Sequence, residues 1–68
     1  MINIATLTES DVGKWVVYRG MGGELDHGRI KSWNDEWIYV VYRCDNWQEF
    51  RSRTGVATSP NDLTLSVN

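Results

Sequence analysis

The sequence predicts an all-β fold, a very small five-stranded antiparallel barrel in one domain over residues 1–68. Three short apolar or aromatic runs, typical of strands, occupy residues 15–18, 28–33 and 37–42. The last two runs are separated only by Asn34-Asp35-Glu36, a connection short enough to indicate a tight β-hairpin. A chain of 68 residues has a marginal core, so its four Trp, three Tyr and one Phe must supply much of the buried area.

Turn signals divide the chain into five expected strands. These strands are residues 14–19, 25–33, 37–43, 56–58 and 64–67. Before the first strand, Thr8 or Ser10 is expected to cap one helical turn, and Gly13 supplies the turn into the strand. Gly28, within the second strand, indicates a bulge or the sharp bend that a small barrel needs to close.

The chain between the third and fourth strands, residues 44–55, is predicted to be an irregular connection. Trp47 and Phe50 are three residues apart, so they can share one face of a helical turn and hold this connection down. Near the C-terminus, Ser59 as N-cap and Pro60 at the first helical position predict one 3-10 turn before the last strand.

The alternation of side chains along each strand assigns the two faces of the barrel. The residues expected inside are Val16, Tyr18, Ile30, Ile38, Val40, Tyr42, Val56 and Leu63, with the small residues Gly28 and Ser32. The residues expected outside are Trp15, Val17, Arg19, Arg29, Lys31, Trp33, Trp37, Tyr39, Val41 and Arg43. The outer set is unusual because it mixes aromatic rings with basic side chains.

Charge balance and cysteine content limit the classes of protein that fit the chain. Seven basic against nine acidic residues give a net charge of −2, which argues against a general nucleic-acid coat but allows a local basic stripe. Cys44 is the single cysteine, as expected for a protein of the reducing cytoplasm. No apolar run approaches about 18–20 residues, and the N-terminus lacks the marks of a signal peptide. A cytoplasmic protein without membrane contact is therefore expected.

Neither catalysis nor metal binding is indicated. His27 is the single histidine, and no serine lies in a nucleophile-elbow context, so a solvent-facing histidine is expected. Cys44 follows Arg43, yet without a second cysteine or a motif it is expected to be structural. No cluster of His and Cys suits a metal ion. We therefore expect no enzyme, and no catalytic residue, metal or cofactor.

The outer aromatic face is the candidate site. Trp, Tyr and Arg are enriched at interface hot spots, and contiguous exposed rings are uncommon on monomers. The candidate partner-binding residues are Trp15, Arg29, Trp33, Trp37, Tyr39, Arg43, Arg51 and Arg53. An equally weighted alternative is that the connection 44–55 covers these rings with Trp47 and Phe50.

The order of the expected elements resembles that of SH3-like barrels, including the Tudor and KOW types. The resemblance rests on residues 12–18, 28–30, 38–42 and 57–63. The last of these segments is similar to the T-x-P-x-D-L close of many small barrels, and the outline also resembles a group of short, mostly uncharacterised bacteriophage proteins. The resemblance implies a five-stranded SH3-like barrel with one 3-10 turn near the C-terminus. Such barrels host peptide binding, nucleic-acid binding and scaffolding alike.

Two hypotheses of different classes follow. The first is a non-enzymatic protein-binding module, such as a phage accessory protein that binds a host protein in the host cytoplasm and modulates or inhibits it. The alternative is a nucleic-acid-binding barrel that combines aromatic stacking with a basic stripe. The stripe would consist of Arg29, Lys31, Arg43, Arg51 and Arg53. A homodimer that pairs strand edges at Leu25 or Thr58 is a further option.

Overall fold

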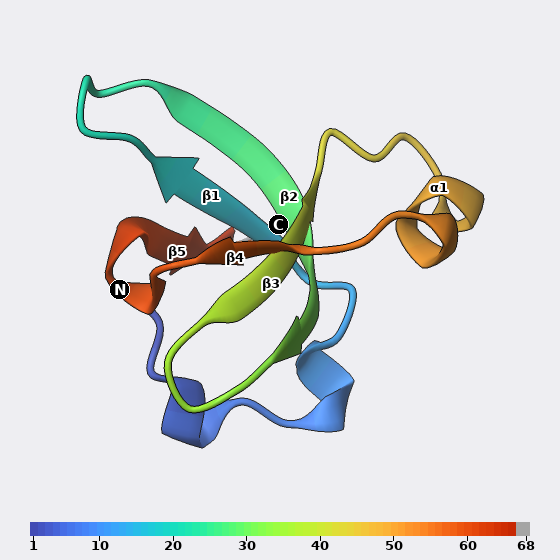
Figure 1. Ribbon diagram of the computed structural model, residues 1–68, viewed down its shortest axis with the longest axis horizontal. Coiled ribbons are helices and arrows are strands. Elements are labelled where there is room, and N and C mark those ends of the chain that lie inside the picture. Colours follow the sequence, from blue (N-terminus) through green and yellow to red (C-terminus); the bar gives the residue numbers. More distant parts are fainter. Residues whose placement is uncertain (67–68) are drawn as a thin grey trace.

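A computed structural model, which describes residues 1–66, shows a five-stranded antiparallel sheet (Figure 1). The strands are β1 (Trp15–Arg19), β2 (Leu25–Trp33), β3 (Ile38–Tyr42), β4 (Val56–Thr58) and β5 (Leu63–Leu65). Their order in the sheet is β4-β3-β2-β1-β5. The all-β prediction is confirmed, and the predicted strand bounds are close to the observed ones. Val67, predicted to belong to the last strand, lies outside the described residues.

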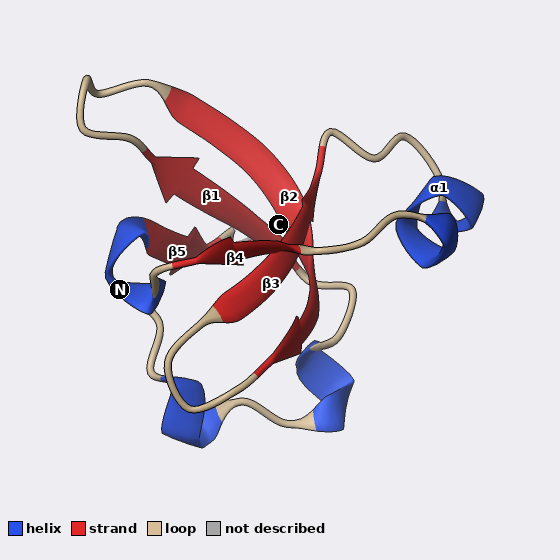
Figure 2. Cartoon of the chain, in the orientation of Figure 1, coloured by secondary structure: helices blue, strands red, loops and turns tan. Residues whose placement is uncertain are grey.

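Short helical elements precede the first strand and connect later ones (Figure 2). They are the 3-10 turns η1 (Ile4–Thr6), η2 (Glu9–Asp11) and η3 (Pro60–Asp62) and the helix α1 (Trp47–Ser52). The turn η3 is the predicted one, with the Ser59 side chain accepting a hydrogen bond from the Asn61 amide. The connection predicted to be irregular contains α1, and this helix carries Trp47 and Phe50 as the expected helical turn does. Its cap is Asn46, whose side chain accepts a hydrogen bond from the Glu49 amide at 2.8 Å.

The sheet is not closed into a barrel. β4 and β5 are its two edge strands, and within residues 1–66 no ladder joins them. The turn η3 carries the chain from one edge to the other, while the sheet curls around a single main core. The free strand edges are therefore those of β4, which contains Thr58, and β5. Leu25 belongs to the interior strand β2 and pairs with Arg19.

The main core lies on the inner face of the curled sheet, largely as the alternation predicts. Its buried members are Ile2, Val16, Ile30, Ile38, Val40 and Leu63, and Tyr18 and Tyr42 pack against them. The prediction for Val56 was wrong: its side chain is 55% exposed. β4 is an edge strand, so no neighbouring strand covers this end of the inner face.

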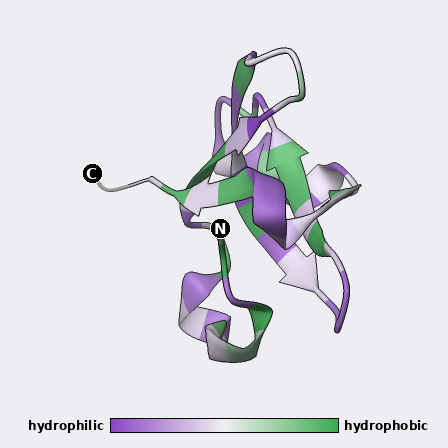
Figure 3. Ribbon diagram, turned by 90° about the vertical axis from the view of Figure 1, so that its left-hand side faces the viewer, coloured by the Kyte–Doolittle hydropathy of each residue, from purple (hydrophilic) through white to green (hydrophobic). Residues whose placement is uncertain are grey.

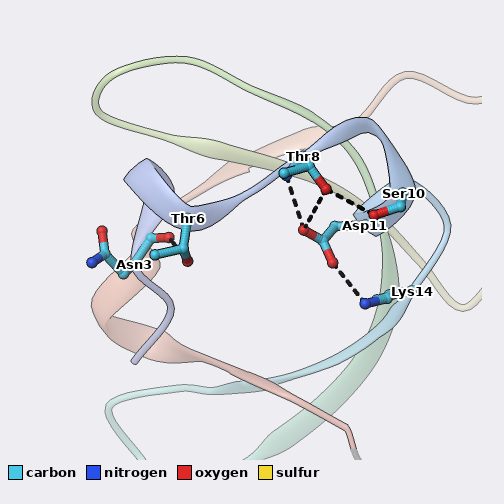
Figure 4. A network of polar contacts seen from close by, with 6 residues as sticks. All are labelled: Asn3, Thr6, Thr8, Ser10, Asp11 and Lys14. Carbon is cyan, nitrogen blue, oxygen red and sulfur yellow. Dashed lines mark hydrogen bonds and ion pairs between the residues drawn. The ribbon is translucent and has the colours of Figure 1, made fainter.

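The N-terminal segment completes this core, which the sequence did not indicate. The Ile2 amide donates to the Pro60 carbonyl at 3.0 Å, and the Ile2 side chain is buried. Figure 3 shows apolar stretches both on the strands and along this segment. Around η2, the Asp11 carboxylate accepts from the Thr8 amide and pairs with the Lys14 ammonium at 2.7 Å (Figure 4). The bond from Lys14, followed by that from Thr8, holds the pKa of Asp11 below its usual value.

A register shift between Ile30 and Ser32 interrupts the ladder between β2 and β3, so Lys31 has no partner on β3. The extra residue reverses the alternation beyond it. Ser32, expected inside, is exposed, and Trp33, expected outside, packs against the main core. Both predictions were wrong for this reason. Gly28, where the bulge was expected, is instead a close-packing position, because a Cβ atom there would lie 2.8 Å from the Val41 carbonyl oxygen.

Candidate functional site

The predicted outer aromatic face is partly covered by α1, as the alternative prediction held. Phe50 packs with Val41 and Cys44 into a second buried cluster, and Trp15 packs against that cluster. The Trp47 ring meets the Phe50 ring edge-on, with the ring centroids 5.5 Å apart. Trp15 is therefore largely used in holding α1 to the outer face of the sheet.

Arg29 is held between two indole rings. Its guanidinium carbon lies 4.1 Å from the Trp15 ring centroid and 4.4 Å from that of Trp47. Its Nη1 atom donates to the Gly13 carbonyl at 2.7 Å. Gly13 itself has a φ of 90° and lies against the Trp47 ring, where a side chain would meet both strain and a clash. Arg29 thus joins the start of β1 to α1 through two cation–π contacts and a hydrogen bond.

Lys31 holds the other end of α1. Its ammonium donates to the carbonyls of Phe50, Arg51 and Arg53 at 2.7, 2.8 and 2.9 Å. An ammonium has three protons, so all of its donors are used. A cation at the C-terminal end of a helix also complements the helix dipole. Two members of the predicted basic stripe, Arg29 and Lys31, are therefore occupied by contacts within the chain.

The other predicted site residues do not form one patch. Trp33 packs against the main core. Arg43, with a φ of 56° at the end of β3, has a largely exposed side chain whose Nε lies 3.4 Å from an Asp26 oxygen. Tyr39, Arg51 and Arg53 line a groove beside α1. Trp37, which is 42% exposed, lines a separate groove on the inner side of the sheet.

This second groove, which we call the aromatic groove, has a volume of about 400 Å³. Its lining residues belong to the β1–β2 hairpin, to β3 with the turn before it, and to the chain from β4 to η3. Its lining includes the rings of Tyr18, Trp37 and Tyr42, the carboxylates of Asp26 and Asp62, and Thr58. Alternation placed both tyrosines inside; it did not indicate that the inner face opens at this end. The signal that could have indicated the groove was the position of the two tyrosines at the ends of β1 and β3, where the strands extend past the buried core.

Hydrogen bonds fix the floor of the aromatic groove. The Thr58 hydroxyl donates to the Val56 carbonyl at 3.1 Å and lies 2.7 Å from the Tyr42 hydroxyl oxygen. Because Thr58 has one hydroxyl proton, Tyr42 donates to Thr58 when both bonds are made. The Tyr18 and Tyr42 rings meet edge-on, with their centroids 6.1 Å apart. Burial raises the pKa of the Tyr42 hydroxyl above its usual value. The hydrogen bond with the Thr58 hydroxyl lowers this pKa, and the nearby charges of Tyr18, Asp26 and Asp62 raise it further.

A fixed turn positions Trp37 at the edge of the aromatic groove. The Asn34 side-chain oxygen accepts from the amides of Glu36 and Trp37, both at 2.8 Å. The backbone amide of Asn34 in turn donates to the Trp37 carbonyl at 2.9 Å. The backbone that carries the Trp37 indole is therefore held by hydrogen bonds at both its amide and its carbonyl. This lowers the entropy that the indole loses when a ligand binds.

The aromatic groove is negatively charged. Its lining contains Asp26 and Asp62 and no Lys or Arg. The contact between Asp26 and Arg43 is solvent-exposed on the arginine side, so it is a weak pair that a ligand cation can replace. Among residues 1–66, no group of three or more His, Cys, Asp or Glu side chains is arranged to hold a metal ion.

Comparison with known proteins gives a short partial match. No protein-family model matches the chain, and no solved structure matches it. Over 41 residues, 60% of the chain, it is 42% identical to sensory neuron membrane protein 1 of Aedes aegypti. The matched part is only 8% of that protein's length. None of the helices in residues 1–66 has the length and apolar character needed to cross a membrane.

Proposed function

We propose that this chain is a non-enzymatic protein-binding module that holds an extended segment of a partner protein in the aromatic groove. One observation carries the proposal: Tyr18, Trp37 and Tyr42 share a groove of about 400 Å³. Tyr and Trp are the side chains that most often dominate binding energy, because large rings lose water at little cost in side-chain entropy. The volume is within the usual range of ligand sites, about 300–1,000 Å³.

The charges around the groove favour a basic segment. A Lys or Arg side chain entering it would meet Asp26 and Asp62 and lie near aromatic faces, which attract cations. β4 forms one wall of the groove and is also a free edge of the sheet. An extended ligand beside β4 can therefore form main-chain hydrogen bonds while its alternate side chains enter the groove.

We also propose that the fold is an SH3-like arrangement. The strand order β4-β3-β2-β1-β5 and the 3-10 turn between β4 and β5 support an SH3-like arrangement with an open ladder. That the source is a bacteriophage, that the partner is a host protein and that the chain acts in the cytoplasm stay predictions from the sequence outline.

The nucleic-acid alternative has less support than the protein-binding proposal. Of the five cations of the predicted stripe, Arg29 and Lys31 donate to backbone carbonyls, and Arg43 lies beside Asp26. The aromatic groove, with its two carboxylates, would repel phosphates. Of the predicted stripe, only Arg51 and Arg53 have guanidinium groups without an internal carboxylate or ring contact in residues 1–66.

A selection from a random-sequence peptide library tests the proposal. Peptides selected on the intact chain should be rich in Lys or Arg, and calorimetry should show that Trp37→Ala weakens their binding by about 30-fold or more, or at least 2 kcal/mol. Asp26→Asn should also weaken it. Leu25→Ala, which removes an exposed apolar side chain outside the groove, is the matched control and should bind like the parent. Peptides that bind the parent and Trp37→Ala equally well would place the site elsewhere.

A further inference from the structure

The groove beside α1, which we call the basic groove, has the opposite electrostatic character. It has a volume of about 360 Å³, and its lining includes Lys31, Tyr39, Arg51 and Arg53 with the hydroxyl residues Ser52 and Thr54. Within residues 1–66, no carboxylate lines it. The chain carries a net charge of −2, so three of its seven cations in one groove are a marked local segregation of charge. It shares no lining residue with the aromatic groove.

The backbone that carries the two arginines is fixed. Lys31 binds the carbonyls of Arg51 and Arg53 at 2.8 and 2.9 Å. At the far end of the segment, Gly55 lies so close to β3 that a Cβ atom there would be 2.7 Å from the Tyr39 Cβ. The arginine side chains therefore extend from a segment held at both ends, and both are exposed. Because the backbone is held, its ordering adds little to the entropy lost when the two side chains bind a ligand.

The donors of the basic groove suit an anion. No carboxylate within residues 1–66 lies at ion-pair distance from the Arg51 or Arg53 guanidinium. Tyr39 accepts at its hydroxyl from the Asn34 side-chain amide at 3.1 Å, which leaves the Tyr39 proton free to donate. Planar guanidinium groups bind phosphate oxygens with paired, charge-assisted hydrogen bonds.

We propose that the basic groove binds a phosphate monoester or free phosphate as the dianion, between Arg51 and Arg53. Neither guanidinium has a carboxylate partner within residues 1–66, so two positive charges are available to match the two negative charges of one such group. Arg53 Nη1 makes one long contact, at 3.4 Å, with the Arg43 carbonyl, and the other Arg53 donors remain free for an anion. A nucleic acid carries a row of singly charged diesters, which calls for a longer series of cations than this groove holds. The field of Lys31 adds to the attraction, although its protons are already used by carbonyls. This inference does not depend on the aromatic groove.

Titration of the intact ¹⁵N-labelled chain by NMR tests it, with O-phosphoserine, inorganic phosphate, sulfate and an oligothymidylate as probes at constant ionic strength. O-phosphoserine should shift the side-chain resonances of Arg51 and Arg53 in a saturable way. Arg51→Gln and Arg53→Gln should each weaken binding about tenfold. Both variants keep the main-chain carbonyls that Lys31 binds, so they should remain folded. Arg19→Gln, which removes an exposed cation outside the groove, is the matched control and should bind normally.

The pH dependence and the choice of probe make the test decisive. The monoester O-phosphoserine takes up a proton and loses one negative charge below its second pKa of about 6, whereas sulfate keeps both of its charges. Binding of O-phosphoserine should therefore weaken below that pH while sulfate binding persists. Tighter binding of O-phosphoserine than of inorganic phosphate assigns the site to esters, and the reverse assigns it to free phosphate. The proposal is overturned if Arg19→Gln weakens binding as much as Arg51→Gln, if oligothymidylate binds more tightly than the monoester, or if no probe saturates.

Discussion

Replacing Lys31 with methionine should release α1 from the sheet. Methionine keeps the apolar stem and removes the ammonium, so the change isolates the three hydrogen bonds to the Phe50, Arg51 and Arg53 carbonyls. Two of these bonds are exposed, so water can replace the ammonium there, whereas the bond to Phe50 is partly buried. A hydrogen bond to a charged group contributes about 1.5–3 kcal/mol. We expect the free energy of unfolding to fall by about 2 kcal/mol.

For a domain of this size, that loss lowers the melting temperature by roughly 8–16 °C. Thermal unfolding followed by circular dichroism measures the shift, and amide hydrogen exchange should show the largest loss of protection in α1. Arg51→Met is the matched control, because that side chain is a cation on the same helix with an exposed head. It should change the free energy of unfolding by less than about 0.5 kcal/mol. Equal melting temperatures for the parent and Lys31→Met would refute a stabilising role for the three bonds.

Two further predictions concern the two faces of the sheet. Trp33→Ala should lower the free energy of unfolding by about 2–4 kcal/mol in denaturant titrations, because Trp33 packs against the main core. Trp37→Ala should lower it by less than about 1 kcal/mol. A larger loss for Trp37→Ala than for Trp33→Ala would contradict the reversal of the two faces after the bulge at Lys31. Tyr42 should titrate above the ordinary value of 10.0, as seen in the difference between the phenolate absorbance of the parent and that of Tyr42→Phe. A raised pKa stabilises the folded chain fully below 10.0, and this contribution is lost as the pH rises through the folded pKa; a Tyr42 midpoint at or below 10.0 would exclude the effect.

Strand positions could be predicted from the sequence because they depend on local alternation and turn residues. β2 and β4 have the predicted bounds, and Ser59 with Pro60 marks η3 correctly. The helix α1 could also have been found. Asn46 followed three residues later by Glu49 is a typical start signal, and the Asn46 side chain accepts from the Glu49 amide as an N-cap does. The Glu49 carboxylate accepts from the Asp45 amide at 3.2 Å.

The bulge at Lys31 could not be predicted in the same way. A bulge is visible in a sequence only when a glycine or a break in the pattern marks it, and Lys31 lies in a run that continues to alternate. Gly28 was the marked position, yet its lack of a side chain serves close packing against Val40 and Val41. One unmarked residue therefore changed the predicted side of both Ser32 and Trp33.

The aromatic groove was missed for a related reason. Alternation distinguishes the inner face from the outer one, but it does not say how far along each strand the inner face is covered. Tyr18 and Tyr42 have the predicted direction, and Val56 lies on the uncovered edge strand beside them. Where two sheet edges stay unpaired, the end of the inner face becomes a surface.

The bulge also determines which faces of the molecule are left for binding. By removing Lys31 from the ladder, it allows the ammonium to reach the end of α1, while Arg29 holds the start of that helix between Trp15 and Trp47. Of the outer rings that looked most like an interface, Trp15 is thereby used to attach a helix. Two of the grooves that stay open have opposite charge, one lined by rings and carboxylates and one by Arg51 and Arg53. Because they share no residue, variants in one groove can be tested without disturbing the other, and a partner that carries both a basic and a phosphorylated group could occupy both.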